Sequence, residues 1–225
     1  GGARNSLTYA QVQEKILTLA NWFAANGVVH GDRIAVTGKN SPEWATVYLA
    51  ALYAGAIICP IDYALHDTEI ENLLNTAQPK FLFVDEEKYE YFTGKNFSFK
   101  VYSLSPKHTD LYAYNLKSNR KITDIIPATE NDTAAILFTS GTTGTPKGVM
   151  LSHKNLVSDC YIAQTHMNIF PTDVFYALLP IHHAYTMLAV FIEAISIGAQ
   201  LVFGKSMAVS RLMKELKEGH ITMLL

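Results

Sequence analysis

Short apolar stretches alternate with helical patterns in the first third of the chain, and this alternation limits the fold more than any other feature. Three stretches, "RIAVTG", "AIICPI" and "KFLFV", have the length and composition of buried strands. The helical patterns "SPEWATVYLAALYAG" and "TEIENLLNTA" separate them. Strands joined through a helix pair in parallel, because the crossover returns the chain to the same end of the sheet. We therefore predict an α/β fold of layered parallel or mixed sheets with flanking helices.

Local signals place the ends of the first two helices. Thr8 and Gln11 have the spacing of a capping box, and Gly27 is suited to end the helix that they begin. The dipeptide "SP" at residues 41–42 combines a typical N-cap with a proline in the first turn, and Gly55 is suited to end that helix. These signals predict two helices on either side of the first strand.

The rest of the chain falls into a polar part and a second α/β part. Residues 85–127 are mainly polar, which predicts a surface connection with one or two edge strands, such as "FKVYSL". Beyond Asn131 we expect strands at "TAAILFT", "GVMLS", "VFYALLP", "QLVF" and "ITMLL", with helices between the later ones. We divide the chain into two α/β subdomains, residues 1–130 and 131–225. Because "ITMLL" has the pattern of a buried strand and nothing polar follows it, we expect the chain to be the N-terminal part of a longer protein.

Composition and charge argue against several classes of protein. Apolar residues make up 49% of the chain and charged residues 17%, as in a folded globular protein. A net charge of −2 gives no basic surface for nucleic acid. The apolar stretch 184–197 contains Glu193 and is too short to span a bilayer. Cys59 and Cys160 lie in apolar surroundings, which predicts two buried free thiols and a cytoplasmic protein. The sequence is compatible with peripheral membrane contact and with a homodimer.

The stretch "LFTSGTTGTPKGVM" lies between two expected strands, and its composition suits a phosphate-binding hairpin. Residues 139–148 contain three glycines, five hydroxyl side chains, one proline and one lysine. Glycines let backbone N–H groups approach an anion, hydroxyls can bind phosphate or hydrated Mg²⁺, and Lys147 adds a positive charge. The loop differs from a Walker motif, because Lys147 is followed by glycine instead of serine or threonine. We predict antiparallel strands over residues 137–151 with a mobile tip at 142–146.

The motif "FTSGTTGTPKG" resembles the phosphate-loop signature of the AMP-forming adenylate enzymes, which include acyl-CoA synthetases, peptide-synthetase adenylation domains and firefly-type luciferases. The segments "LTYAQV", "LYAGAIICPID" and "LPIHHAYTM" resemble other family segments and follow in the family's order. "KNSPEW" and "GVMLSHKNL" are most similar to medium- or long-chain fatty acyl-CoA ligases. The resemblance implies part of the large N-terminal domain of an acyl-CoA synthetase-like fold, without the small C-terminal domain.

The resemblance also implies a reaction and its residues. Such enzymes use ATP, Mg²⁺ and coenzyme A to convert a carboxylic acid, here a fatty acid, to an acyl-AMP and then to a thioester. Lys147 and His183 are the implied catalytic residues. The implied phosphate-binding residues are Thr139, Ser140, Gly141, Thr142, Thr143, Gly144 and Lys147, with Thr139 or Thr142 reaching Mg²⁺. The implied acyl-pocket residues are His182, His183, Tyr185 and Met187, with His183 preferred over His182.

Alternatives remain for each part of this interpretation. Met187, Trp22 and Trp44 have the spacing of core residues, and histidines beside an apolar helix are commonly structural. The chain could instead belong to an amino- or aryl-acid adenylation domain that loads a carrier protein, or to a non-catalytic phosphate-binding protein. The family's Tyr-Gly-x-Thr-Glu motif, ribose-binding aspartate and C-terminal lysine do not occur in this sequence. We therefore expect the 225 residues alone to be inactive.

Overall fold

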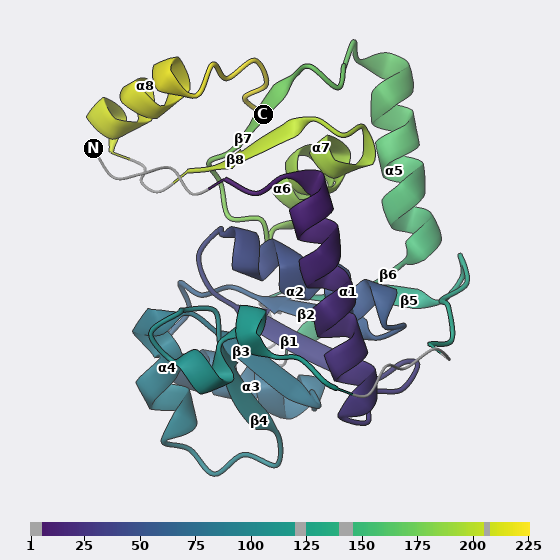
Figure 1. The fold of residues 1–225 in the computed structure, drawn as a ribbon, viewed down its shortest axis with the longest axis vertical. Helices are drawn as coiled ribbons and strands as arrows, with labels where there is room; N and C mark the ends of the chain where they lie inside the picture. The colour runs from purple at the N-terminus through teal and green to yellow at the C-terminus, as the bar shows by residue number, and fades with distance from the viewer. Residues whose placement is uncertain (1–5, 120–124, 140–145, 205–207) are drawn as a thin grey trace.

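A computed structural model describes residues 6–119, 125–139, 146–204 and 208–225, and within them the chain forms two sheets flanked by helices (Figure 1). The larger sheet has six strands in the order β4-β3-β1-β2-β5-β6, and the smaller one pairs β7 with β8. The smaller sheet forms a separate layer beyond one end of the six-stranded sheet, and helix α1 runs alongside both (Figure 1). The predicted α/β fold is confirmed.

The six-stranded sheet is parallel except at one edge. β1 lies at its centre and pairs in parallel with β2 and β3, as the alternating sequence pattern predicted. β4 adds to β3 in parallel, β5 adds to β2 in parallel, and β6 turns back antiparallel to β5. The strands are β1 (Arg33–Thr37), β2 (Ile57–Ile61), β3 (Phe81–Val84), β4 (Lys100–Ser103), β5 (Thr133–Thr139) and β6 (Lys147–Ser152).

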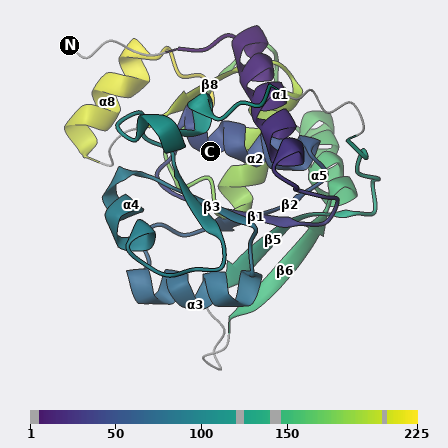
Figure 2. The same ribbon diagram turned by 60° about the horizontal axis from the view of Figure 1, so that its bottom comes forward.

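Helices cover both faces of this sheet, which explains why its central strands are mainly apolar. Helices α1 (Tyr9–Ala25) and α2 (Pro42–Tyr53) lie on one face and α3 (Asp67–Ala77) on the other (Figure 2). Along β1, Ile34 belongs to the hydrophobic cluster beneath α1 and α2, whereas Ala35 belongs to the cluster beneath α3. A strand buried on both faces needs no polar side, so its sequence is a continuous apolar run.

The predicted helix ends are confirmed in their capping contacts. Thr8 and Gln11 form a capping box, in which each side chain accepts a hydrogen bond from the other residue's backbone N–H. The Ser41 side chain accepts a hydrogen bond from the backbone N–H of Trp44. Gly27 and Gly55 follow the two helices with φ angles of +79° and +75°, which L-residues rarely adopt.

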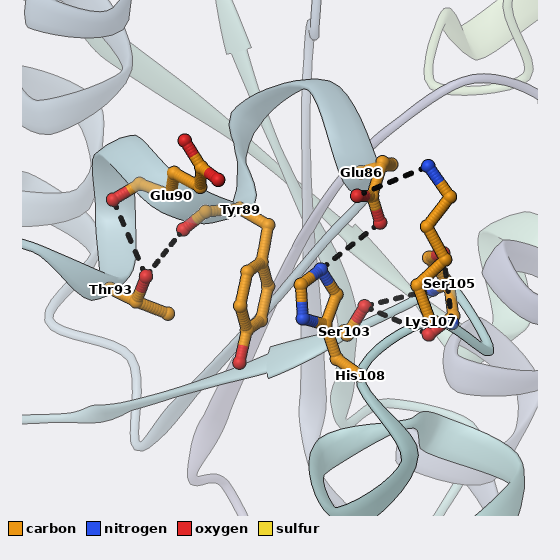
Figure 3. Close-up of polar contacts among 8 residues, drawn as sticks. All are labelled: Glu86, Tyr89, Glu90, Thr93, Ser103, Ser105, Lys107 and His108. Carbon is orange, nitrogen blue, oxygen red and sulfur yellow. Dashed lines mark hydrogen bonds and ion pairs between the residues drawn. The ribbon is translucent and has the colours of Figure 1, made fainter.

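The polar segment after β3 contains more regular structure than its sequence predicts. It holds the expected edge strand β4, but also a helix, α4 (Glu86–Thr93), and two 3₁₀ turns, η1 (Thr109–Leu111) and η2 (Ala113–Asn115). A network of side chains ties α4 to the segment that follows β4 (Figure 3). The His108 ring stacks on Tyr89 with centroids 3.5 Å apart, and His108 Nε2 lies 3.0 Å from Glu86 Oε2. Because these contacts join residues distant in sequence, no local pattern reveals them.

The second half of the chain contributes α5 and the two-stranded sheet. The Ser152 side chain caps α5 as predicted, by accepting a hydrogen bond from the Asn155 N–H. β7 and β8 are parallel, and the expected apolar helix between them is interrupted by one π-helical stretch, η3. The elements are α5 (His153–His166), β7 (Val174–Ala177), α6 (Ala184–Thr186), η3 (Met187–Ile192), α7 (Glu193–Ser196), β8 (Gln200–Phe203) and α8 (Val209–Glu218).

The prediction of a strand at "ITMLL" is wrong. Met223 makes a single bridge to Phe175 of β7, and the segment forms no named strand. Met223 donates its N–H to the Val174 carbonyl and accepts from the Tyr176 N–H, but Leu224 is exposed. An apolar run becomes a strand only where a partner strand lies opposite it for several residues, and here that contact ends after one bridge.

Several predicted core residues are confirmed. Trp22 and Trp44 lie in the hydrophobic core, and Cys59 and Cys160 are buried free cysteines. Burial raises the pKa of both thiols to about 12, so they remain protonated at neutral pH. One hydrophobic cluster includes residues from both sides of residue 130, and the division into two subdomains stays a prediction. In the described ranges, no helix combines the length and the apolar character needed to cross a membrane.

Candidate functional site at the carboxyl edge of the large sheet

The hairpin that carries the glycine- and threonine-rich loop forms as predicted. β5 and β6 pair antiparallel, with Phe138 opposite Gly148 and Thr139 opposite Lys147. Lys147 is exposed at the start of β6. The structure does not describe residues 140–145, so the predicted mobile tip, apart from Pro146, and five of the predicted phosphate-binding residues lie outside the described residues. These five are Ser140, Gly141, Thr142, Thr143 and Gly144.

Gly148 is required by the way the two strands of the hairpin pack. A Cβ atom at Gly148 would lie 2.8 Å from Cγ2 of Ile136 on β5. The branched Ile136 side chain has little freedom to move away, since its χ1 angle is restricted. The last glycine of the signature therefore has a structural role in the hairpin, apart from any contact with a ligand.

The carboxyl ends of β2 and β5 place Asp62 level with the mouth of this hairpin. Ile58 of β2 pairs with Ala135 of β5 in parallel. Asp62 is four residues beyond Ile58, and Thr139 is four residues beyond Ala135, so the two residues lie at the same height along the sheet. In open α/β sheets, ligands bind at the carboxyl ends of the strands. The hairpin loop therefore begins at the edge where a ligand is expected.

The histidine pair reaches the same edge from the second layer. His182 follows β7, is only 9% exposed, and places Nε2 3.4 Å from Oδ1 of Asp62. Its ring meets Tyr63 edge-on and lies 4.3 Å from the ring of His183, measured between centroids. The pKa of His182 is lowered to about 4, chiefly by burial and to a smaller extent by His183, against the opposing effect of the Asp62 carboxylate. The buried imidazole is therefore neutral at pH 7.

Asn40, just beyond β1, holds the segment that carries these histidines. Its Nδ2 donates hydrogen bonds to the carbonyl oxygens of Ala177 (3.1 Å) and Leu179 (2.8 Å). Its Oδ1 accepts a hydrogen bond from the backbone N–H of Ile181 at 2.9 Å. One side chain thus bonds the backbone at three alternate residues on the path toward His182, and fixes the end of β7 against the end of β1.

The four predicted pocket residues take different positions. His182 and His183 lie together beside Asp62, while Tyr185 is 61% exposed on α6. Met187 is fully buried, and its Sδ accepts a hydrogen bond from the hydroxyl of Tyr48 at 3.0 Å. Met187 thus packs in the core behind the histidines. The roles of all four in binding a substrate stay predictions.

Sequence reasoning missed Asp62 and Asn40. Both residues directly follow or nearly follow a buried strand, and each lies inside a segment that the sequence singled out, "LYAGAIICPID" and "KNSPEW". Their position after the strand was a usable signal, because polar residues at the carboxyl ends of parallel strands converge at one edge. The sequence does not show that both residues contact the same segment, at and after the end of β7.

Comparison with known proteins places the whole chain in one group. The family described as AMP-binding enzyme matches residues 2–225. The chain is 30% identical over 216 residues to the medium-chain fatty-acid–CoA ligase of Escherichia coli (strain K12), covering 88% of this chain and 37% of the relative. It is 28% identical over 238 residues to 4-coumarate–CoA ligase CCL1 of Humulus lupulus, covering 99% of this chain and 42% of the relative.

A solved structure shows the same arrangement of the backbone. The crystal structure of ATP-bound MatB from Rhodopseudomonas palustris matches with a TM-score of 0.82 and 28% sequence identity, over 96% of this chain and 43% of that one. The chain thus spans about two fifths of the length of the curated relatives described above.

Proposed function

The chain belongs to the family of AMP-binding enzymes, and on this premise we propose that it is part of an ATP-dependent ligase that joins a carboxylic acid to coenzyme A. In the first step the carboxylate displaces pyrophosphate from ATP and forms an acyl-AMP. In the second step the thiol of coenzyme A displaces AMP and forms a thioester. Activation is needed because the oxide of a free carboxylate is too poor a leaving group for a thiol to displace.

One observation carries this proposal: the glycine- and threonine-rich hairpin and the histidine pair meet at the same edge of the sheet. The register of β2 and β5 brings the start of the hairpin loop level with Asp62, and Asp62 Oδ1 lies 3.4 Å from His182 Nε2. The proposed phosphate-binding hairpin would thus begin close to the histidines that are proposed to contact the acid. That is the arrangement needed to bring a carboxylate to a nucleotide phosphate.

The hairpin residues are proposed to bind the phosphates of ATP. Lys147 is exposed at the mouth of the hairpin, where its charge would stabilise the departing pyrophosphate. When bound, Mg²⁺ would neutralise further phosphate charge, with the hydroxyl of Thr139 or Thr142 reaching it. The other proposed phosphate-binding residues are Ser140, Gly141, Thr143 and Gly144.

The acyl group is proposed to lie against the segment after β7. His183 and Tyr185 are exposed there, next to the buried His182, and would contact the acid. Met187 would support the pocket from the core side, where Tyr48 fixes its sulfur atom. A histidine beside the carboxylate can orient it by hydrogen bonding, and His183 is proposed for that role.

A medium- or long-chain fatty acid is the proposed substrate. The similarity to the fatty-acid–CoA ligase of Escherichia coli supports it, whereas the similarity to the 4-coumarate–CoA ligase favours an aryl acid as the second candidate. The buried, protonated thiols of Cys59 and Cys160 suit a reducing compartment, which supports a cytoplasmic location.

Acid-dependent exchange of labelled pyrophosphate into ATP tests the substrate. The parent protein that contains this chain is assayed with fatty acids, 4-coumarate and amino acids, and we expect exchange with fatty acids only. Exchange with 4-coumarate alone would show that the substrate is an aryl acid and not a fatty acid. Exchange with none of the acids would contradict the proposed function. The 225-residue chain by itself should show no turnover when acyl-AMP is trapped with hydroxylamine.

Lys147→Ala in the same parent protein tests the role of the hairpin. Losing one charge that acts as pyrophosphate departs typically costs ~3 kcal/mol, or about 10²-fold in the rate of acyl-AMP formation. Lys147→Arg should rescue only part of this loss, because a planar guanidinium needs more room than an ammonium group. Single-turnover formation of acyl-AMP measures the rate. An unchanged rate in the alanine variant would mean that Lys147 is only a surface residue of the hairpin.

A further inference from the structure

We propose that Asp62, His182 and His183 form a binding site for a divalent transition-metal ion, best represented by Zn²⁺. The site uses one carboxylate oxygen and two imidazole nitrogens, and these three ligand atoms all lie within 4.8 Å of one another. In the described part of the chain, this is the one group of three or more such residues with ligand atoms this close together. The inference goes beyond the ligase reaction and does not depend on it.

The spacing of the ligand atoms suits a tetrahedral ion. Zn²⁺ binds histidine nitrogen and carboxylate oxygen at roughly 2.0–2.2 Å, which puts two ligands of a tetrahedron about 3.4 Å apart. His182 Nε2 and Asp62 Oδ1 are 3.4 Å apart. An octahedral ion with the same bond lengths would need its neighbouring ligands about 3 Å apart. This one separation fits a tetrahedral ion, and two imidazole nitrogens are ligands that suit zinc rather than magnesium.

The buried nitrogen of His182 is a second, independent pointer to a ligand. His182 Nε2 is inaccessible to solvent and makes no hydrogen bond of acceptable geometry with any described group. A buried polar atom without a partner is costly, so such an atom in a folded protein calls for an explanation. A metal ion bound between His182 and Asp62 would satisfy it.

The chemistry of the three side chains suits such an ion. Imidazole nitrogen is a common zinc ligand, and the carboxylate of Asp62 would compensate part of the charge of the ion. His183 supplies the third ligand from the adjacent position in the chain.

The site is both held in place and open to solvent. Asn40 accepts a hydrogen bond from the N–H of Ile181, the residue before His182, which limits the freedom of the histidine segment. His183 is exposed, so an ion can enter from solution, and a fourth position remains for water. Three protein ligands and one open position are typical of zinc sites that bind a further ligand.

Isothermal titration of Zn²⁺ into the 225-residue chain tests the site, in buffer without ATP or chelator. We expect one ion per chain and at least about a tenfold loss of affinity in both Asp62→Asn and His183→Ala, since even residues that only orient a zinc ligand contribute about 10–100-fold. His183 is exposed and asparagine keeps the size of Asp62, so both variants should fold, which circular dichroism checks. Co²⁺ should give the intense visible absorption of a tetrahedral site.

Matched variants separate this site from other histidines on the surface. His166→Ala removes an exposed histidine at the end of α5, and Asp110→Asn an exposed acid of η1, and neither should change the affinity. The proposal is overturned if the unchanged chain binds no Zn²⁺. It is also overturned if Asp62→Asn and His183→Ala bind as tightly as the unchanged chain. The ligase proposal would survive either result, because this assay contains no nucleotide and no acid.

Discussion

The six-stranded sheet and the two-stranded sheet contain similar apolar strands but are stabilised in different ways. All four residues of β3 are buried, whereas β8 has one exposed residue and three that are only half-buried. The large sheet has a hydrophobic cluster on each face. The small sheet shares one of these clusters and relies in addition on polar contacts from the first layer.

These polar contacts reach across most of the chain. The Tyr9 hydroxyl donates a hydrogen bond to the carbonyl of Ala199 at 2.7 Å, just before β8. The Asn40 side chain hydrogen-bonds the carbonyl of Ala177, at the end of β7, and the N–H of Ile181. The comparison indicates that the large sheet is stabilised mainly by the hydrophobic clusters on its two faces. The small sheet, in which β7 is largely buried but β8 is not, also has particular polar partners. Four experiments probe the two sheets and their surroundings, in order of decreasing expected effect.

Phe83→Ala and Phe203→Ala compare one phenylalanine from each sheet. Phe83 on β3 is fully buried, so its loss should lower the free energy of unfolding by about 3–5 kcal/mol. Phe203 on β8 is half-buried, and its loss should cost only about 1–2 kcal/mol because less apolar surface is involved. Urea denaturation of both variants measures the two values. Equal losses would show that the two sheets are stabilised alike.

Asn40→Ala removes three hydrogen bonds between the layers. We expect the free energy of unfolding to fall by about 2–3 kcal/mol, at about 1 kcal/mol for each bond lost at a half-buried site. Hydrogen exchange at the Ile181 amide should also become faster. Asn115→Ala is the matched control, because this exposed side chain donates one hydrogen bond, to Thr109 within its own segment. Equal effects of the two substitutions would mean that Asn40 does not hold the layers together.

Gly148→Ala tests how tightly the edge hairpin of the large sheet is packed. The new methyl group would lie 2.8 Å from Ile136 Cγ2, so the free energy of unfolding should fall by about 1–3 kcal/mol. In an Ile136→Ala background the same substitution should cost much less, because the obstructing group is gone. This double-mutant cycle isolates the contact between the two residues. An additive result would show that the close approach is not what requires glycine.

His153→Gln has the smallest expected effect and concerns the junction between β6 and α5. Burial lowers the pKa of His153 below its usual value, Asp132 opposes the shift, and His30 adds to it. Below about pH 6.5 the unfolded chain therefore binds a proton that the folded chain does not, and stability falls as the pH drops. The glutamine variant cannot titrate, so its stability should fall less steeply over this range. Thermal unfolding at several pH values measures the slope, and identical slopes would contradict the assignment.

Much of the large sheet could be predicted because its signals are local. The capping box of Thr8 and Gln11 begins α1, and the dipeptide at 41–42 begins α2, through contacts within one helical turn. Buried strands alternate with these helices, and parallel pairing follows from that alternation. The hairpin of β5 and β6 was predictable for the same reason, since both strands adjoin the loop that joins them.

The remaining features depend on contacts that no short stretch of sequence contains. α4 lies in a polar segment, where the stacking of His108 on Tyr89 joins parts of the chain that the pattern shows only as surface. The terminal "ITMLL" has the composition of a strand, yet β7 lies opposite it at one residue only. In both cases the secondary structure of the segment depends on which residues pack against it.

By itself, the sequence determined the order of helices and strands, the hairpin with its phosphate-loop motif and the family, because each rests on residues close together in the chain. Only the tertiary structure brings together the residues of the site at the carboxyl edge of the large sheet. Asp62 and His182 are separated by a hundred and twenty positions, 62 to 182, and they meet because β2 and β7 end at neighbouring places in two different layers. The two side chains lie 3.4 Å apart because a hydrophobic cluster that includes residues of both sheets fixes the layers relative to each other, and many residues contribute to it.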